Sequence, residues 1–443
     1  MISTKFNAKL RYAVLLALGI AANPAHAVFQ VQCPGDTVNG DATWTGAEVR
    51  PDPNGAAPGT TKCMHLTGGD AFVKMADGTV MYSFGFANLT GIASLPATNN
   101  LIQSNGLFAA QWPAPTIALD EGDRVYLTLS NIGMTLRPDL FDPHSVHFHG
   151  FPNASAYFDG EPESTFGVNM GASTTYFYNV REPGTYMYHC HVEAAEHMQM
   201  GMLGNLYVHP AQNGQNLGGF NNFVFNDGDG STGYSTGMEF PLQLGSADSK
   251  FRESNYKVQL APGVYAFARM KDDYAQINGR GYPDTVNMVT APTPANPSLV
   301  DASNPAMQPQ VAQLPAGGPA PAQANVKITQ KMGSKVVANA GQKILLRLSS
   351  LSVTAFYTVT ASGLPLQVVG QGAKILRGAG ELNGPNLYYK TSSVTLGGGE
   401  ANEVLVDTAG IAPGTYFLYT TNLDHLSNGN EDNGGMMTEI QIL

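Results

Sequence analysis

Short runs in which apolar and polar residues alternate recur along much of the chain. Residues 124–130, RVYLTLS, are a clear example. A period of two is typical of a β-strand with one buried face. No segment shows the apolar spacing of a long amphipathic helix. The pattern predicts an all-β protein, and 443 residues are enough for two β-sandwiches with additional loops.

Two pieces of the alternating pattern are repeated. Residues 183–191, PGTYMYHCH, align with 413–421, PGTYFLYTT, and residues 122–127, GDRVYL, align with 341–346, GQKILL. Self-similarity over such a distance indicates two copies of one structural unit. We therefore expect two tandem sandwiches with the same strand order.

The repeat and the local composition predict where these units begin and end. The first domain is expected at 28–212 and the second at 220–443. Residues 211–229 are rich in Gly and Asn and are expected to be a linker. A Pro/Ala-rich stretch at 291–324 is expected to be an extended loop of the second domain.

The N-terminus has the pattern of a secretory signal. Three basic residues precede an apolar stretch at 12–22, and Ala25-His26-Ala27 fits the small-x-small cleavage rule. We expect residues 1–27 to be a signal peptide and the mature chain to be periplasmic or extracellular. The apolar stretch is too short for a membrane anchor, and no later segment is long and apolar enough to span a bilayer.

Charge and cysteine content narrow the possible partners. The net charge of −11 argues against nucleic acids and anionic membranes. It suits a cationic redox partner, although solubility explains it equally well.

Of the three cysteines, Cys33 and Cys63 are expected to form a disulfide in an oxidising compartment, with two unpaired thiols as the alternative.

The strongest chemical signal is the tripeptide His189-Cys190-His191. Side chains on a strand alternate between its two faces, so Cys190 points to one side and the two histidines to the other. One Cys, two His and a weak axial Met describe a blue-copper site. The chain offers His144, Cys190, His197 and Met202 for such a site.

A second metal pocket follows from the same periodicity. His147 and His149 are two residues apart and share a face, as His189 and His191 do. Four imidazoles would then converge from two neighbouring strands. A single His is usually structural, and a cluster of Met usually fills a core. Six of the ten histidines, however, lie between positions 144 and 197. Zinc also binds Cys and His, but it requires neither the thioether nor a thiolate between two imidazoles.

These motifs resemble the multicopper oxidase superfamily, which is built from cupredoxin domains. The motif H-x-x-H-x-H-G at 144–150 and the motif His-Cys-His followed by His and Met are the family's copper motifs. Residues 112–117, 121–125 and 158–160 also resemble its first domain. The resemblance implies two tandem cupredoxin-like Greek-key β-sandwiches and a copper oxidoreductase.

The resemblance also implies roles for individual residues. His144, Cys190, His197 and Met202 match the type 1 copper ligands. His147, His149, His189 and His191 match half of the ligands of the cluster that reduces dioxygen. Asp159 matches an acidic residue that assists proton transfer there, although Asp-Gly is also a common turn. Glu193 and Glu196 are either partners that orient the imidazoles or solvated loop carboxylates.

The chain departs from the family in two places. His197 follows Cys190 by seven positions, where many members have five, so the ligand loop is longer. In the second half, Tyr419, Thr420 and Thr421 replace the expected ligands, and His425 is the only histidine after position 209. Half of the imidazoles for a trinuclear cluster are therefore missing.

Three interpretations remain open for this incomplete pocket. A second copy or a partner subunit supplies the missing histidines, and the protein reduces dioxygen with electrons from a small molecule, a metal ion or a redox protein. Alternatively, one type 2 copper binds, as in a nitrite reductase. Finally, the pocket is vestigial, and the protein is an electron carrier or a copper-binding protein. We favour the first, because a carrier does not need four correctly spaced histidines.

Overall fold

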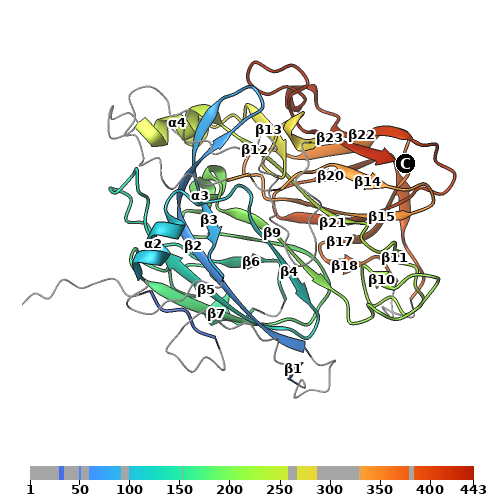
Figure 1. Cartoon of the computed structure of the whole chain (residues 1–443), viewed down its shortest axis with the longest axis horizontal. Helices are drawn as coiled ribbons and strands as arrows, with labels where there is room; N and C mark the ends of the chain where they lie inside the picture. The colour runs from blue at the N-terminus through green and yellow to red at the C-terminus, as the bar shows by residue number, and fades with distance from the viewer. Residues whose placement is uncertain are drawn as a thin grey trace, which may run out of the picture.

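The structure is a computed structural model in which the described residues are 29–33, 49–50, 59–90, 99–152, 154–257, 267–286, 329–330, 332–378 and 384–443. The predicted signal peptide at 1–27 and the Pro/Ala-rich loop at 291–324 lie outside them. Strands dominate and the described helices are short, so the predicted all-β class is confirmed (Figure 1). No helix in the described ranges has the length and apolar character needed to cross a membrane.

The first half of the chain forms two packed sheets. One contains β1 (Val49–Arg50), β2 (Gly59–Lys74), β3 (Val80–Asn88), β5 (Arg124–Asn131) and β7 (Ser173–Asn179). The other contains β4 (Ala114–Asp120), β6 (His147–His149), β8 (Gly184–His189) and β9 (Leu203–His209). Their inward side chains form one core, in which Leu127 of β5 and Phe148 of β6 are buried. The helices of this half are α2 (Asn99–Gly106), α3 (Ala194–Met200) and η2 (Ala156–Phe158).

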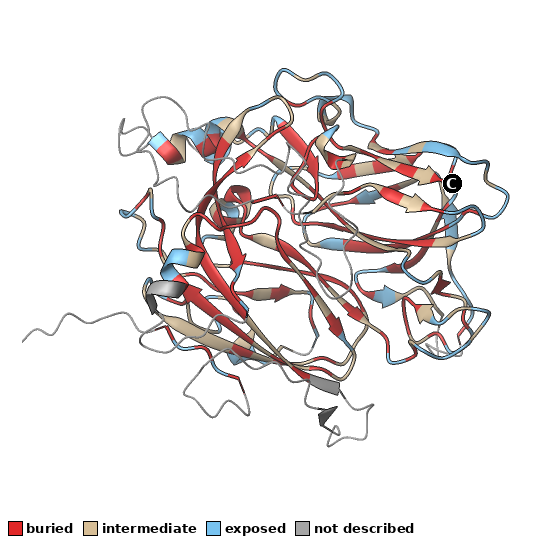
Figure 2. Cartoon of the chain, in the orientation of Figure 1, coloured by how far each residue is buried: buried red, intermediate tan, exposed pale blue. Residues whose placement is uncertain are grey.

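The second half repeats this architecture. Its larger sheet contains β12 (Glu239–Ala247), β13 (Tyr274–Ile277), β15 (Lys343–Ser350), β17 (Leu366–Gln371), β18 (Lys374–Ile375), β19 (Tyr389–Thr391) and β21 (Glu400–Asp407). The smaller contains β14 (Val336–Ala338), β16 (Tyr357–Ala361), β20 (Ser393–Leu396), β22 (Gly414–Thr420) and β23 (Met437–Ile442). Its helices are α4 (Ser249–Lys257), η3 (Phe267–Arg269), η4 (Asp284–Val286) and η9 (Leu423–His425). Figure 2 shows buried residues along the strands of both halves.

Strand pairing in the two halves follows the internal repeat of the sequence. β5 lies between a parallel neighbour, β2, and an antiparallel neighbour, β7. β15 lies in the same way between β12 and β21. β8 and β22, which carry the repeated Gly-Thr-Tyr, each lie between two antiparallel partners. The two sandwiches are thus built alike, while the domain limits 28–212 and 220–443 stay predictions.

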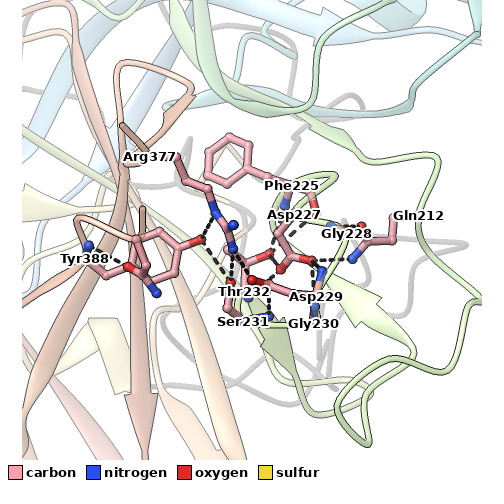
Figure 3. Close-up of polar contacts among 11 residues, drawn as sticks. Gln212, Phe225, Asp227, Gly228, Asp229, Gly230, Ser231, Thr232, Arg377 and Tyr388 are labelled. Atoms are coloured by element: carbon pink, nitrogen blue, oxygen red, sulfur yellow. Dashed lines mark hydrogen bonds and ion pairs between the residues drawn. The ribbon is translucent and has the colours of Figure 1, made fainter. Parts of the chain in front are cut away.

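The segment expected to be a linker, 211–229, forms a turn that is held by side-chain hydrogen bonds. The buried carboxylate of Asp227 accepts hydrogen bonds from the side-chain amide of Gln212 at 2.7 Å and from the backbone N–H of Gly230 at 2.8 Å (Figure 3). Arg377 of the second sandwich forms an ion pair with Asp229 at 2.5 Å. The strands β10 (Asn222–Phe223) and β11 (Gly233–Tyr234) pair across the turn. The connection is therefore fixed to the second half.

A line of charged side chains joins the two sandwiches. His209 contacts Asp120 at 3.0 Å and Glu239 of β12 at 2.9 Å. Glu239 in turn pairs at 2.5 Å with Arg347, which is fully buried. Arg347 also donates to the hydroxyl of Thr185 at 3.0 Å. Each buried charge therefore has an oppositely charged or hydrogen-bonding partner, as burial requires.

Replacing His209 by glutamine is expected to destabilise the protein in a pH-dependent way. Burial alone would lower the pKa of His209, but its bonds to Asp120 and Glu239 outweigh burial and raise it to about 9. A raised pKa stabilises the folded state fully below pH 6.5, and the contribution is lost as the pH rises through 9. We expect a loss of about 2 kcal/mol in unfolding free energy at pH 6, from a hydrogen bond to charged groups. Urea denaturation of both proteins should give nearly equal midpoints at pH 10, and a difference that persists there would contradict this assignment.

Candidate metal centres

The sulfur of Cys190 lies in a buried cluster with two histidines. His144 precedes β6, Cys190 directly follows β8, and His197 lies on α3. The Sγ of Cys190 is 3.2 Å from Nδ1 of His197 and 3.9 Å from Nδ1 of His144. These three residues offer ligand atoms that all lie within 4.8 Å of one another, and each residue is buried. The arrangement could hold one metal ion.

Met202 is brought to this cluster by a tight turn. Its N–H donates to the carbonyl of His197 at 2.8 Å, and its own carbonyl accepts from the N–H of Cys190 at 3.1 Å. Its side chain is fully buried. The six residues between Cys190 and His197 include the first turn of α3, whereas a loop was expected there. Gly201, with φ of +125°, ends this helix just before Met202.

Burial sets the protonation of the Cys190 cluster in the metal-free chain. It lowers the pKa of His144 well below its usual value and the pKa of His197 to about 4, so both imidazoles are neutral at pH 7. Burial also raises the pKa of the Cys190 thiol to about 12. The backbone N–H of Ser145 donates to Sγ at 3.4 Å, which favours the thiolate. A bound cation would complete the deprotonation, because thiolate is the form that binds metals.

Gly68 of β2 lies against His144, a contact that no sequence motif predicts. A Cβ at this position would lie 2.6 Å from Cδ2 of His144, closer than side-chain atoms approach. Gly68→Ala is therefore expected to displace His144 and to weaken copper binding at the Cys190 cluster about tenfold, equivalent to about 1.4 kcal/mol. A copper titration followed by visible absorption measures this. Gly245→Ala is the matched control, because its Cβ would meet nothing within 4 Å. Equal affinities would show that Gly68 does not position His144.

Four further histidines converge on the opposite side of Cys190, as the sequence predicts. β6 and β8 are antiparallel, and their register places His147 directly opposite His189. The ring centroid of His147 lies 5.2 Å from that of His189, 5.1 Å from that of His191 and 5.8 Å from that of His149. The four rings line one cavity of about 360 Å³. Their roles as metal ligands stay a prediction.

Three of these four rings are held by contacts at Nδ1. That atom of His147 donates to the backbone carbonyl of Asp159 at 2.7 Å, and that of His189 donates to the carbonyl of Cys190 at 2.9 Å. Nδ1 of His191 lies 3.5 Å from a carboxylate oxygen of Glu161. A contact at Nδ1 leaves Nε2 for a metal, which is the usual way a protein orients a ligand imidazole.

Asp159 lies beside the histidine cavity, and its backbone carbonyl contacts His147 more closely than its carboxylate does. Its carboxylate is 3.6 Å from Nδ1 of His147, farther than its carbonyl. It ends η2, and Gly160 follows with φ of +78°, so the expected turn is also present. Its role in proton transfer stays a prediction. Glu161 belongs to none of the sequence motifs. Its contact with His191 arises only because the turn at Asp159 and Gly160 brings it next to that ring.

An acidic pair borders the outer edge of the Cys190 cluster. Asp142 and Glu193 offer carboxylate oxygens that lie within 4.8 Å of each other and of a ring nitrogen of His197. Nε2 of His197 is buried and has no hydrogen-bond partner among the described residues. Glu193 is exposed and holds His197 through its backbone carbonyl, which accepts the His197 N–H at 3.0 Å. Burial raises the pKa of half-buried Glu196.

The other cysteines and the other described histidines have contacts outside the two clusters. Cys33 and Cys63 form the expected disulfide, so Cys190 is the free thiol. His65 bonds to Ser130 at 2.9 Å, and the ring of His425 packs on Tyr357 at 5.3 Å. β22, the counterpart of β8, ends at Thr420, and no group of metal-ligating residues was found in the described part of the second sandwich.

Comparison with known proteins identifies the region that carries both clusters. Residues 95–213 match the multicopper oxidase family. An iron transport multicopper oxidase of Gibberella zeae is 40% identical over 102 residues, which are 22% of this chain and 15% of that protein. A copper-containing nitrite reductase of Neisseria meningitidis is 32% identical over 106 residues, 24% of this chain and 25% of that one. The matches thus span a small part of these relatives.

Most of the chain is similar in fold to the blue copper oxidase of Nitrosomonas europaea. The TM-score is 0.54 with 20% identity, and the match covers 86% of each chain. At this identity the likeness shows the fold alone, and it confirms the cupredoxin-like architecture. Residues 95–213 thus match the multicopper oxidase family, and copper is the metal of that family.

Proposed function

We propose that this chain is a copper-dependent oxidoreductase with two connected centres. His144, Cys190, His197 and Met202 would hold a type 1 copper, and the histidine cavity would hold copper at which dioxygen is reduced. Copper supplies one-electron redox chemistry at each centre. The residues fit: one buried thiolate source, neutral imidazoles, and a thioether.

One observation carries this proposal: Cys190 and its two neighbours belong to different clusters. The thiol faces His144 and His197, while the flanking imidazoles face His147. Ser145 ties the two sides together, since its N–H donates to Cys190 Sγ and its hydroxyl accepts from the N–H of His191 at 3.1 Å. A short covalent path of three residues therefore joins the site of electron entry to the site of the acceptor.

Asp142 and the exposed Glu193 favour a cationic reductant at the surface beside the buried first centre. Their charges lie beside the His197 ring and would attract a metal ion or a basic redox protein. The variant Asp142→Asn/Glu193→Gln is expected to raise KM for a cationic reductant about fivefold and to leave KM for a neutral phenol unchanged. Steady-state kinetics with each reductant at low ionic strength measure the two KM values. An equal change with both reductants would mean that the acidic pair acts structurally.

Oxygen uptake tests the proposed reaction. The copper-loaded full chain should consume oxygen when given a reductant, and the metal-free protein should not. Replacing oxygen by nitrite under anaerobic conditions tests the second candidate, a nitrite-reductase-like enzyme. The presence of only four imidazoles in the cavity favours that candidate. Reduction of the first centre with turnover of neither acceptor would indicate an electron carrier and would refute an oxidase.

We also propose that the protein acts outside the cytoplasm after removal of residues 1–27. The Cys33–Cys63 disulfide supports an oxidising compartment. N-terminal sequencing of the protein recovered from the periplasm or medium would test this, and a start near Val28 is expected.

A further inference from the structure

The second sandwich forms a wall of the histidine cavity. Its residues Leu351, Ser352, Val353, Gly398 and Gly399 line the same space as the four imidazoles. None of these residues carries an imidazole, a carboxylate or a thiol. The side of the cavity that faces the second sandwich is therefore lined by this chain's own non-ligating backbone and side chains.

This wall is packed closely against the histidines. A Cβ at Gly399 would lie 2.5 Å from Nε2 of His149, and a Cβ at Gly398 would lie 2.2 Å from the carbonyl oxygen of Ser352. Leu351 is buried in a small apolar cluster with Met187 of β8. A side chain at Gly399 would therefore collide with His149, so the second sandwich closes the His149 side of the cavity.

The four imidazoles are not equivalent. His147, His189 and His191 are the three whose ligand atoms lie within 4.8 Å of one another, and each has a contact at Nδ1. His149 has a buried Nδ1 with no hydrogen-bond partner among the described residues, and its Nε2 is directed at Gly399. Three rings are therefore oriented for one ion, and the fourth is packed against the wall.

No further histidine remains to complete a larger cluster. The chain has ten. Besides the two at the Cys190 cluster and the four in the cavity, His65, His209 and His425 have the contacts described above. His26 lies in the N-terminal segment outside the described residues. A trinuclear site needs about twice the four imidazoles present, so the ligand set does not fit one.

We propose that the histidine cavity binds a single copper ion through His147, His189 and His191, and that one chain completes the site without a partner subunit. Three imidazoles leave a coordination position open, and the rest of the cavity has room for a small molecule. The proposal rests on the copper chemistry proposed above, but it concerns the number of ions and the source of their ligands.

Copper content measured together with mass tests this proposal. The full chain is reconstituted with excess cupric ion, freed of unbound metal, and analysed by elemental analysis, native mass spectrometry and electron paramagnetic resonance. We expect one copper at each centre in a monomer, with equal blue and non-blue signals. His147→Ala/His191→Ala should lose only the non-blue ion. His149→Ala and the matched control His425→Gln should each keep both ions.

Two results would overturn the proposal. One is three or more copper ions per chain. The other is a second ion that appears only in an oligomer and is lost when dilution produces monomers. These outcomes are distinct from failure of the proposed function. Extra copper with oxygen consumption would overturn the single-ion site and leave the oxidase intact. A single non-blue ion with no electron transfer from the Cys190 cluster would overturn the proposed function and leave the single-ion site intact.

Discussion

Cys190→Ser is expected to abolish the blue absorption of the copper-loaded protein and its turnover with any reductant. Cys190 is the only soft anionic ligand in its cluster, and the intense colour of such a site requires a thiolate bound to cupric ion. The fold should persist, because serine differs from cysteine in one buried atom. Visible absorption and copper analysis of the loaded variant measure the first effect, and circular dichroism measures the second.

Thiol titration provides the control for this variant. Since Cys33 and Cys63 are joined, the unfolded wild-type chain should react at one thiol and Cys190→Ser at none. Blue absorption that survives in the variant would place the first centre elsewhere in the chain. Loss of the fold, rather than of the colour alone, would show that Cys190 mainly fills the core.

His147→Ala/His191→Ala is expected to stop turnover while leaving the blue centre intact. Both rings face the cavity on the far side of Cys190, so their loss removes ligands of the second centre only. Turnover should fall by more than about 100-fold, because losing only a hydrogen-bond partner of a metal ligand already costs about 10- to 100-fold. The blue absorption and its reduction by one electron should be unchanged.

The control for the cavity variant is His425→Gln, which removes an imidazole outside both clusters. It should retain turnover and both copper signals. If the double variant turns over like the wild type, the cavity is not the site of acceptor reduction. If it loses its blue colour as well, the two centres are not independent, and the loss of turnover could not be assigned to the cavity alone.

Much of the site could be predicted from periodicity, because its ligands lie on or next to strands. The alternation at 124–130 corresponds to β5, and the spacing of two within His147-Phe148-His149 places both rings on one face of β6. The antiparallel register of β6 and β8 then brings them to His189. A period of two fixes which face a side chain occupies, so the separation of Cys190 from its neighbours follows from the sequence alone.

The remaining features depend on long-range packing, which local patterns do not encode. The contact of Gly68 with His144 joins two segments far apart in the sequence, and so does the contact of Gly399 with His149. The stretch expected to be a loop around His197 forms α3, and the expected linker is fixed by Asp227 and Arg377. The sequence shows that histidines are missing from the second sandwich, but only the structure shows which residues of that sandwich line the histidine cavity.

The most direct test of the two connected centres is rapid anaerobic reduction of the fully copper-loaded protein by less than one electron per chain. The blue absorption is expected to bleach and then partly recover at a rate independent of protein concentration, as the electron moves within one chain to the histidine cavity. This recovery should be absent in His147→Ala/His191→Ala. Persistent bleaching in the wild type, or recovery that depends on protein concentration, would contradict this expectation.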